Sequence, residues 1–307
     1  MHGNIKTTLT FASVIILLAV TLFLGIVTVI NDKTGINKND NDKYAGVTGT
    51  PTGEITRAPG EITVTPGEIL TPTATKEPVL VTGTPTATPT IGISHIVCLD
   101  PGHQMKANTE QEEIAEGSGK TASKMSSTGA ISVYDYTNEF QWNMCVADLI
   151  KDELRARGYT VIMTRESNEV DVSNKERALI ANEANAEILV GIQTDAFDDQ
   201  SVKGMYAQIP ASDNPYVDPE NITKSETLAD KILTSVTTAT GARKRAYQYG
   251  NNEITMINWA KMPVCIMQFG YMTNYEEAEK LADETYQKLI VTSVCDGIDA
   301  YFAEIDK

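Results

Sequence analysis

The stretch EILVGIQ, residues 187–193, indicates how the C-terminal part of the chain folds. Most of its residues are apolar, whereas a strand with one solvent-facing side would alternate apolar and polar residues. Such a run is typical of a strand in a parallel sheet covered on both faces. Three further segments have a similar character: residues 96–99, 159–164 (YTVIMT) and 263–269 (PVCIMQF). Residues 204–209 form a weaker strand candidate.

Amphipathic segments separate these strands and predict helices. Apolar residues recur at helical spacing over 138–157, and Gly158 ends that segment. Ser173 and Glu176 form a capping box that opens a second helix to about residue 184. Further helices are expected over 225–238, over 275–282 after the capping residue Asn274, and over 284–304. Alternating strands and helices predict an α/β domain with a mostly parallel sheet and helices on both faces. Ligands of such folds gather beyond the carboxyl ends of the strands.

The first 94 residues differ in character from this domain. After a short tail (1–8), residues 9–30 form 22 uncharged residues, enough to cross a hydrocarbon core of about 30 Å. A cleaved signal peptide is the alternative, but its apolar region would be shorter and followed by an A-x-A-type site, which is missing before Asn31. We therefore expect a transmembrane anchor.

Residues 31–94 contain seven of the twelve prolines among many Thr and Gly residues. GEIT, GEIT and GEIL recur every seven residues there, but the intervening prolines exclude a coiled coil. This composition predicts an extended linker. Basic residues do not decide the orientation of the anchor, but the very short tail before it favours export of the remainder. We expect a single-pass cell-membrane protein whose domain, residues 95–307, lies outside the cytoplasm in the cell wall.

The domain is acidic. The chain has 25 Lys and Arg against 41 Asp and Glu, of which 6 and 7 lie before residue 95, leaving 19 basic and 34 acidic residues. This charge argues against nucleic acid and anionic lipid surfaces as partners.

The four cysteines, at 98, 145, 265 and 295, lie in apolar segments without a CxxC motif. We expect core thiols, although an exported domain leaves one disulfide possible.

Several short motifs occur in a fixed order along the domain. Asp100-Pro101-Gly102-His103 follows the first strand, and residues 104–136 form a polar stretch too long for an ordinary loop. Later motifs are Glu139 with Asn143 one helical turn on, Thr164-Arg165, Glu176-Arg177 with Ala181-Asn182, and PVCIMQFGYMTN at 263–274. In this order they resemble the zinc-dependent N-acetylmuramoyl-L-alanine amidases of the family-3 type, over essentially all of residues 95–307.

The resemblance implies metal-assisted hydrolysis of an amide bond in peptidoglycan. Zinc in such a site takes two histidines and a glutamate, and a second glutamate acts as general base. His103 and Glu139 match the first two ligands, although an acidic residue also suits a helix N-terminus on electrostatic grounds alone. Asp100, Asn143 and Arg165 are expected in the groove around the site.

Two positions depart from the family pattern. Gln193 stands where the family has its second histidine ligand, and Gln268 where it has the catalytic glutamate. An amide oxygen is a poor zinc ligand, and glutamine cannot take a proton from water near neutral pH. The other histidines, His2 and His95, are too far away to substitute. Asp195, two residues beyond Gln193, is a possible compensating ligand because alternate strand residues share a face.

Three hypotheses follow. The chain is a pseudoenzyme that binds peptidoglycan, or a cell-wall enzyme partner, without zinc; or it is an active zinc amidase with a repaired site; or it is a passive membrane-tethered spacer. The paired glutamines favour the first, because two neutral amides can hydrogen-bond to each other and to His103 once the metal is lost. A carboxylate at 268 in an emptied site would be costly.

Overall fold

The computed structural model describes residues 95–307. The predicted tail, anchor and linker, residues 1–94, lie outside the described residues. Within residues 95–307, no helix combines the length and apolar character that crossing a bilayer requires.

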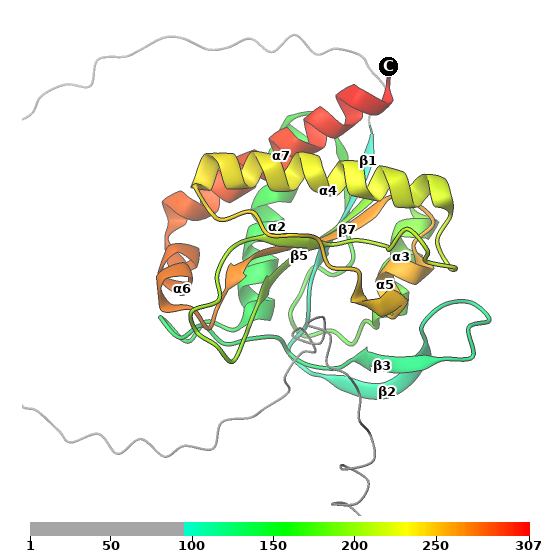
Figure 1. The fold of residues 1–307 in the computed structure, drawn as a ribbon, viewed down its shortest axis with the longest axis horizontal. Coiled ribbons are helices and arrows are strands. Elements are labelled where there is room, and N and C mark those ends of the chain that lie inside the picture. The colour runs from blue at the N-terminus through cyan, green and yellow to red at the C-terminus, as the bar shows by residue number, and fades with distance from the viewer. Residues whose placement is uncertain (1–94) are drawn as a thin grey trace, which may run out of the picture. The chain divides into compact units, whose positions relative to one another are not determined.

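A five-stranded sheet forms the centre of the domain (Figure 1). Its strand order is β4-β1-β5-β7-β6. Strands β4, β1, β5 and β7 are parallel and β6 is antiparallel to β7. Their bounds are Ile96–Pro101 (β1), Thr160–Met163 (β4), Ile188–Asp195 (β5), Tyr206–Gln208 (β6) and Val264–Tyr271 (β7). The predicted mostly parallel sheet is confirmed, and the carboxyl ends of β1, β5 and β7 lie side by side.

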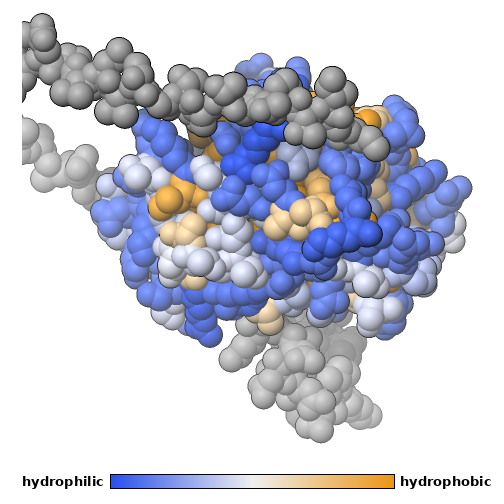
Figure 2. All heavy atoms as spheres, turned by 90° about the horizontal axis from the view of Figure 1, so that it is seen from above, coloured by the Kyte–Doolittle hydropathy of each residue, from blue (hydrophilic) through white to orange (hydrophobic). Residues whose placement is uncertain are grey.

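Helices cover both faces of the sheet, as the apolar strands require (Figure 1). Side chains of one parity in β5, such as Val190, pack with α2 (Glu139–Ala156), α4 (Pro219–Thr240) and α7 (Glu284–Ile305). Side chains of the other parity, such as Leu189, pack with α3 (Asn174–Glu183) and α5 (Thr255–Trp259). Helix α6 (Tyr275–Ala282) follows β7, and a short 3-10 turn, η1, spans Gly250–Asn252. The face seen in Figure 2 is mostly hydrophilic, as the acidic composition predicts.

The sequence-based helix starts are largely confirmed. Ser173 and Glu176 form the expected capping box of α3, and the Asn274 side chain accepts a hydrogen bond from the Glu277 N–H at the start of α6. Helix α4 begins earlier than expected, at Pro219 behind the capping residue Asp218. Proline suits a first helical turn, whose N–H groups have no helical partner.

The polar stretch 104–136, too long for an ordinary loop, contains secondary structure that the sequence pattern did not predict. It contains an antiparallel hairpin of β2 (Asn108–Glu113) and β3 (Thr121–Met125), seen below the main sheet in Figure 1. The hairpin lacks an apolar alternation because most of its side chains are exposed or half-buried. It is fastened by the Trp259 indole N–H, which donates to the Glu113 carbonyl, and by Glu112, which accepts from the Lys175 N–H.

The cysteines differ from the expected set of core thiols at one position. All four are free, and Cys98, Cys265 and Cys295 are buried, but Cys145 is exposed on α2. Burial raises the pKa of the Cys98 and Cys265 thiols far above the ordinary value, so these side chains are neutral core residues.

Candidate active site

Two buried arginines hold the turn that carries His103. Arg177, on α3, is 1% exposed; it pairs with Asp100 at 2.8 Å and donates to the carbonyls of Pro101 and His103. Arg165, after β4, donates to the carbonyls of Pro101 and Gly102 at 2.7 and 3.1 Å. Burial, with the charge of Arg177, lowers the pKa of Arg165 to about 10, so it remains charged at neutral pH. His103 itself has φ 58°, an uncommon conformation for a residue other than glycine.

The residues expected in the groove are therefore mainly structural. Arg165 and Asn143 are buried and bind backbone carbonyls: the Asn143 amide donates to the Gly102 carbonyl at 3.0 Å. Asp100 is buried in its ion pair, although it also contributes to the wall of a cavity. The Arg165 guanidinium and the Asn143 amide nitrogen are bonded to the chain itself, whereas Oδ1 of Asn143 has no partner among the described residues. The expectation that these three residues contact a ligand stays a prediction.

Glu139 opens α2 and points into the site. It is 2% exposed, and its two carboxylate oxygens accept from the N–H groups of Ala130 (2.7 Å) and Thr194 (3.1 Å). His103 lies beside it, with Nε2 3.5 Å from Oε1 of Glu139 and Nδ1 3.1 Å from the Ser127 carbonyl oxygen. The structure thus brings together the two expected ligands His103 and Glu139. Both are oriented by backbone groups from two segments, the one before α2 and the end of β5.

Gln193 and Gln268 face each other across neighbouring strands. They are register partners on β5 and β7, and Nε2 of Gln268 donates to Oε1 of Gln193 at 3.0 Å. The Gln193 side chain lies over Gly102, where an added Cβ would fall 2.3 Å from its Cγ. Glycine at 102 therefore leaves the room that this side chain occupies beside the His103 turn. The expected bond between the two glutamines is present, whereas His103 bonds to Ser127 and lies by Glu139 instead.

Asp195 is not brought to the site. The β5–β7 register shifts between Gln193 and Asp195, so that Asp195 pairs with Tyr271 and the simple alternation of strand faces is broken. Its carboxylate accepts from the Tyr206 hydroxyl at 2.7 Å and from the Ala196 N–H. Burial, then the charge of Asp195, raises the pKa of Tyr206 well above its ordinary value, so the phenol stays a donor. In this structure the Asp195 carboxylate is thus engaged by Tyr206 and Ala196, and its role as a compensating ligand stays a prediction.

Several oxygens at the site lack a partner within the chain. Among the described residues, Oδ1 of Asn143, Oγ1 of Thr194 and Oε1 of Gln268 are buried without a hydrogen bond. Each belongs to a residue that otherwise bonds to Glu139 or Gln193. A buried unsatisfied acceptor costs about 1–3 kcal/mol. Three buried oxygens around Glu139 and Gln193 are consequently without a hydrogen-bond donor among the described residues.

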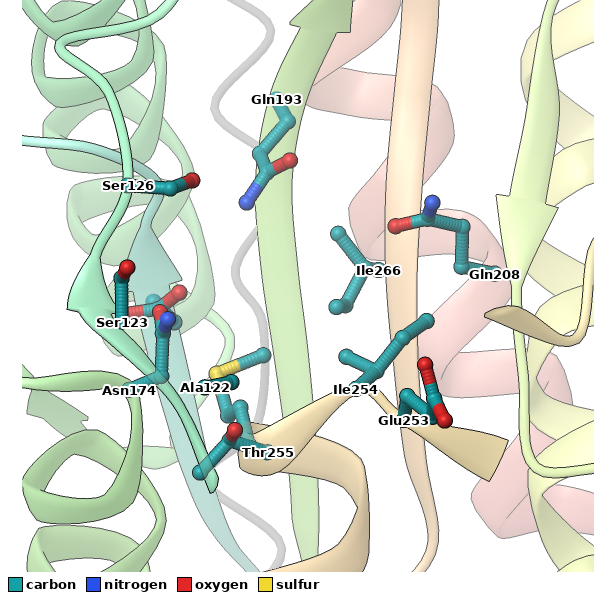
Figure 3. Close-up of a pocket in the computed structure, with 12 residues that line it drawn as sticks. Ala122, Ser123, Ser126, Asn174, Gln193, Gln208, Glu253, Ile254, Thr255 and Ile266 are labelled. Atoms are coloured by element: carbon teal, nitrogen blue, oxygen red, sulfur yellow. The ribbon is translucent and has the colours of Figure 1, made fainter. Parts of the chain in front are cut away.

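A cavity of about 280 Å³ adjoins Gln193 on the side of the sheet that carries α5 and the hairpin (Figure 3). In Figure 3 the Gln193 amide lies opposite Ser126, with Ile254, Ile266 and Gln208 on the other side. The walls of this cavity combine hydroxyl, amide and aliphatic groups from the hairpin, β5, β6, β7 and the segment before α5. A second, wider cleft of about 750 Å³ lies between residues 105–110, which follow His103, and residues 169–171. Open space therefore exists on both sides of the turn.

The residues present do not fit a zinc ion. His103 and Glu139 supply two suitable donors, but the next side chains are the amides of Gln193 and Gln268, which zinc does not favour. Within residues 95–307, no three His, Cys, Asp or Glu side chains are placed to hold a metal ion together. No metal-dependent step is derived for this chain.

The fold and site define a class: α/β domains with a histidine and a glutamate at the carboxyl edge of a parallel sheet, in the arrangement of peptidoglycan amidases. The sequence model of the N-acetylmuramoyl-L-alanine amidase family matches residues 97–300. The chain belongs to this family.

Individual relatives are distant. N-acetylmuramoyl-L-alanine amidase LytC of Bacillus subtilis (strain 168) is 24% identical over 210 residues, which are 68% of this chain but 36% of LytC. The chain thus spans about a third of that relative's length.

Among solved structures, the amidase Ami1 of Mycobacterium abscessus matches with a TM-score of 0.60 and 22% identity, over 68% of this chain and 100% of Ami1. The CwlD amidase of Clostridioides difficile, solved with the GerS lipoprotein, matches with a TM-score of 0.53 and 19% identity, over 69% of this chain and 100% of CwlD. Residues 95–307 therefore have the extent of a complete solved amidase fold.

Sequence analysis missed two groups of site residues. The first is the backbone of Ala130 and Ser127, which lies in the polar stretch 104–136 and orients Glu139 and His103. The second is the role of Arg177, which was noted only as part of a motif. A buried position for Arg177 could have been inferred from its place on the apolar side of α3, beside Ala178 and Ala181.

Proposed function

We propose that this chain binds peptidoglycan through its amidase domain and has lost most or all hydrolysis. The carrying observation is the hydrogen bond between Gln193 and Gln268. It joins the positions where the family has a zinc ligand and a general base. Two amides in contact are a stable, neutral replacement, but they supply neither metal binding nor proton transfer.

Retention of the surrounding scaffold supports binding. Arg165 and Arg177 still hold the His103 turn, and Glu139 is still fixed by two backbone N–H groups. Unpaired acceptors and two open spaces adjoin that turn. Peptidoglycan offers matching donors in its acetamido and peptide N–H groups. The N-terminal segment, proposed to be a membrane anchor and linker, would hold the domain in the cell wall.

A protein partner from the same environment is part of the proposal. CwlD has been solved in complex with a lipoprotein, so an amidase fold of this kind can serve as one side of a protein complex. A domain that occupies peptidoglycan without cutting it would limit, or direct, the access of an active wall enzyme. Peptidoglycan would then be a ligand of this domain and the substrate of its partner enzyme.

Co-sedimentation with purified sacculi and release of stem peptides test the proposal. Residues 95–307 are compared with the Gln193→His, Gln268→Glu variant, each with added zinc. The control is Gln111→His, Gln200→Glu, which makes the same replacements at exposed positions. We expect the parent and control to bind without releasing peptides, and the site variant to release them. Release by the parent at the rate of the site variant, abolished by His103→Ala, would favour the active amidase instead. Absence of binding would refute the proposal.

A further inference from the structure

An exposed group of aromatic side chains lies on the segment that leads into the site. Tyr134 and Tyr136 belong to the segment before α2, and Tyr275 is the first residue of α6. Tyr134 and Tyr275 meet edge to face, with ring centroids 5.5 Å apart. In Figure 1 the segment before α2 passes beside the start of α6. The three side chains are 40%, 77% and 61% exposed.

The backbone of Tyr136 is held in a conformation that its side chain disfavours. Five described residues other than glycine have a positive φ, and three are asparagines, which tolerate it. The remaining two are His103 and Tyr136, with φ 58° and 64°. His103 belongs to the site. Little burial of the Tyr136 side chain offsets the cost of this conformation. We therefore expect the compensating contact to be made with a ligand.

The segment that presents the aromatic side chains is rigid. The Ser132 N–H donates to the Thr137 carbonyl and the Tyr136 N–H donates to the Ser132 carbonyl, which closes the segment. The Asp135 side chain accepts from the N–H and hydroxyl of Thr137. The Val133 N–H donates to the Met272 carbonyl beyond β7. A rigid segment with tyrosines loses little conformational entropy when it binds a ligand.

The same segment leads directly into the site. Ala130, which donates to Glu139, lies four residues before Tyr134, and Glu139 lies three residues after Tyr136. A ligand that reaches the His103–Glu139 pair and extends along this segment would meet the tyrosines. Their rings offer flat apolar faces and their hydroxyls offer hydrogen bonds, a combination suited to ligands with both apolar faces and polar edges.

The charge of the domain favours a neutral ligand at this platform. Residues 95–307 have 34 acidic against 19 basic side chains. Stem peptides end in carboxylates, which this excess of negative charge repels, whereas N-acetylated sugars of the glycan carry no charge. The faces of such sugars present C–H groups, which pack on aromatic rings.

We propose that Tyr134, Tyr136 and Tyr275 form a platform on which N-acetylated sugars of the glycan strand stack. This platform rests on the proposed function, because it assigns the glycan part of peptidoglycan to one edge of the site. It places the sugar chain over the segment before α2 and leaves the cavity beside Gln193 to other parts of the ligand.

Calorimetric titration with the neutral β-1,4-linked tetramer of N-acetylglucosamine tests the platform on residues 95–307. The variants are Tyr136→Ala, Tyr275→Ala and Tyr136→Phe, with Tyr249→Ala as a matched control at an exposed tyrosine beside η1. If a sugar–ring contact resembles an aromatic pair in strength, each alanine variant weakens binding roughly two- to twelvefold. Tyr136→Phe, which keeps the ring, should bind more tightly than Tyr136→Ala, and Tyr249→Ala should bind like the parent.

A further variant tests whether Tyr136 has a structural role. Tyr136→Gly should bind the tetramer as weakly as Tyr136→Ala while unfolding at a temperature no lower than the parent. Alanine variants that bind like the parent would overturn the platform. So would a domain that binds sacculi but not the tetramer, an outcome that leaves the proposed function intact. Failure to bind sacculi at all would overturn both.

Discussion

The substitution Gln268→Glu alone should destabilise the domain strongly at neutral and alkaline pH. Gln268 is 4% exposed, and its Nε2 donates to Gln193 Oε1 at 3.0 Å. A carboxylate there would face an acceptor in place of this bond and would share the site with the buried carboxylate of Glu139. The nearby Arg165 and Arg177 are already engaged by carbonyls and by Asp100. The neutral Gln193 amide can turn its Nε2 toward the new carboxylate, but one such bond does not offset a buried charge.

The magnitude follows from the pKa of the introduced carboxyl group. Buried glutamates reach a pKa of about 8–9, and each unit corresponds to about 1.4 kcal/mol. A rise of about two to three units, because of burial and the Glu139 charge, therefore lowers the free energy of unfolding by about 3–4 kcal/mol above the folded-state pKa. Below the unfolded-state pKa, near 4, the group is protonated in both states and this loss vanishes. In its protonated form it also donates to Gln193.

Urea unfolding followed by circular dichroism at pH 4, 6 and 8 measures this loss. The difference from the parent should grow as pH rises, whereas Gln200→Glu, at an exposed position, should stay within about 0.5 kcal/mol of the parent throughout. Adding Gln193→His and zinc should recover stability at pH 8, by about 2.7 kcal/mol at a hundredfold excess over the dissociation constant. A loss independent of pH, or no loss at pH 8, would refute the argument that a charge is buried at this position.

Three other substitutions test the scaffold. Tyr136→Gly should raise the free energy of unfolding by about 1 kcal/mol in urea, because glycine adopts a positive φ without strain; a lower value would show that the tyrosine packs. Arg177→Ala should cost about 3–5 kcal/mol by leaving the Asp100 charge buried and unpaired, and adding Asp100→Asn should restore part of it, which a purely steric loss would not allow. Burial raises the pKa of Glu277 despite bonds from the Tyr271 and Gly204 N–H groups. Its contribution is therefore present below the unfolded-state pKa and lost as pH rises through the folded value. Stability relative to Glu277→Gln should fall from pH 4 to 7, and an unchanged difference would contradict the shift.

The fold was predictable because its buried strands form continuous apolar runs, which are easily recognised in the sequence. Buried parallel strands such as residues 187–193 are apolar throughout, and the caps at Ser173 and Asn274 are local signals. The β2–β3 hairpin was not predictable by the same rule. Its stability comes from a few distant contacts, such as that of Trp259 with the Glu113 carbonyl, which leave no periodic pattern in the hairpin itself.

The same distinction holds within the site. His103 and the facing glutamines were expected at the strand ends, because parallel strands align their carboxyl ends, and Glu139 was expected beside them from the family resemblance. The position of Asp195 was not, because one register shift between neighbouring strands turns its carboxylate toward Tyr206. The roles of Arg165 and Arg177 depend on carbonyl groups of a turn, whose directions the sequence does not specify.

Under the proposed function, binding and hydrolysis would depend on different residues of this domain, so that binding would persist without hydrolysis. The His103 turn is held by Arg165, Arg177 and Asp100, and none of these bonds involves Gln193 or Gln268. Replacing a ligand and a base with two amides therefore leaves the turn, the cavity and the tyrosine segment in place. A domain with only Gln193 and a glutamate at position 268 would be less stable. The glutamate would then be a buried carboxylate without a metal ion to balance its charge. The two glutamines form one coupled unit, and their hydrogen bond allows the emptied position to stay neutral.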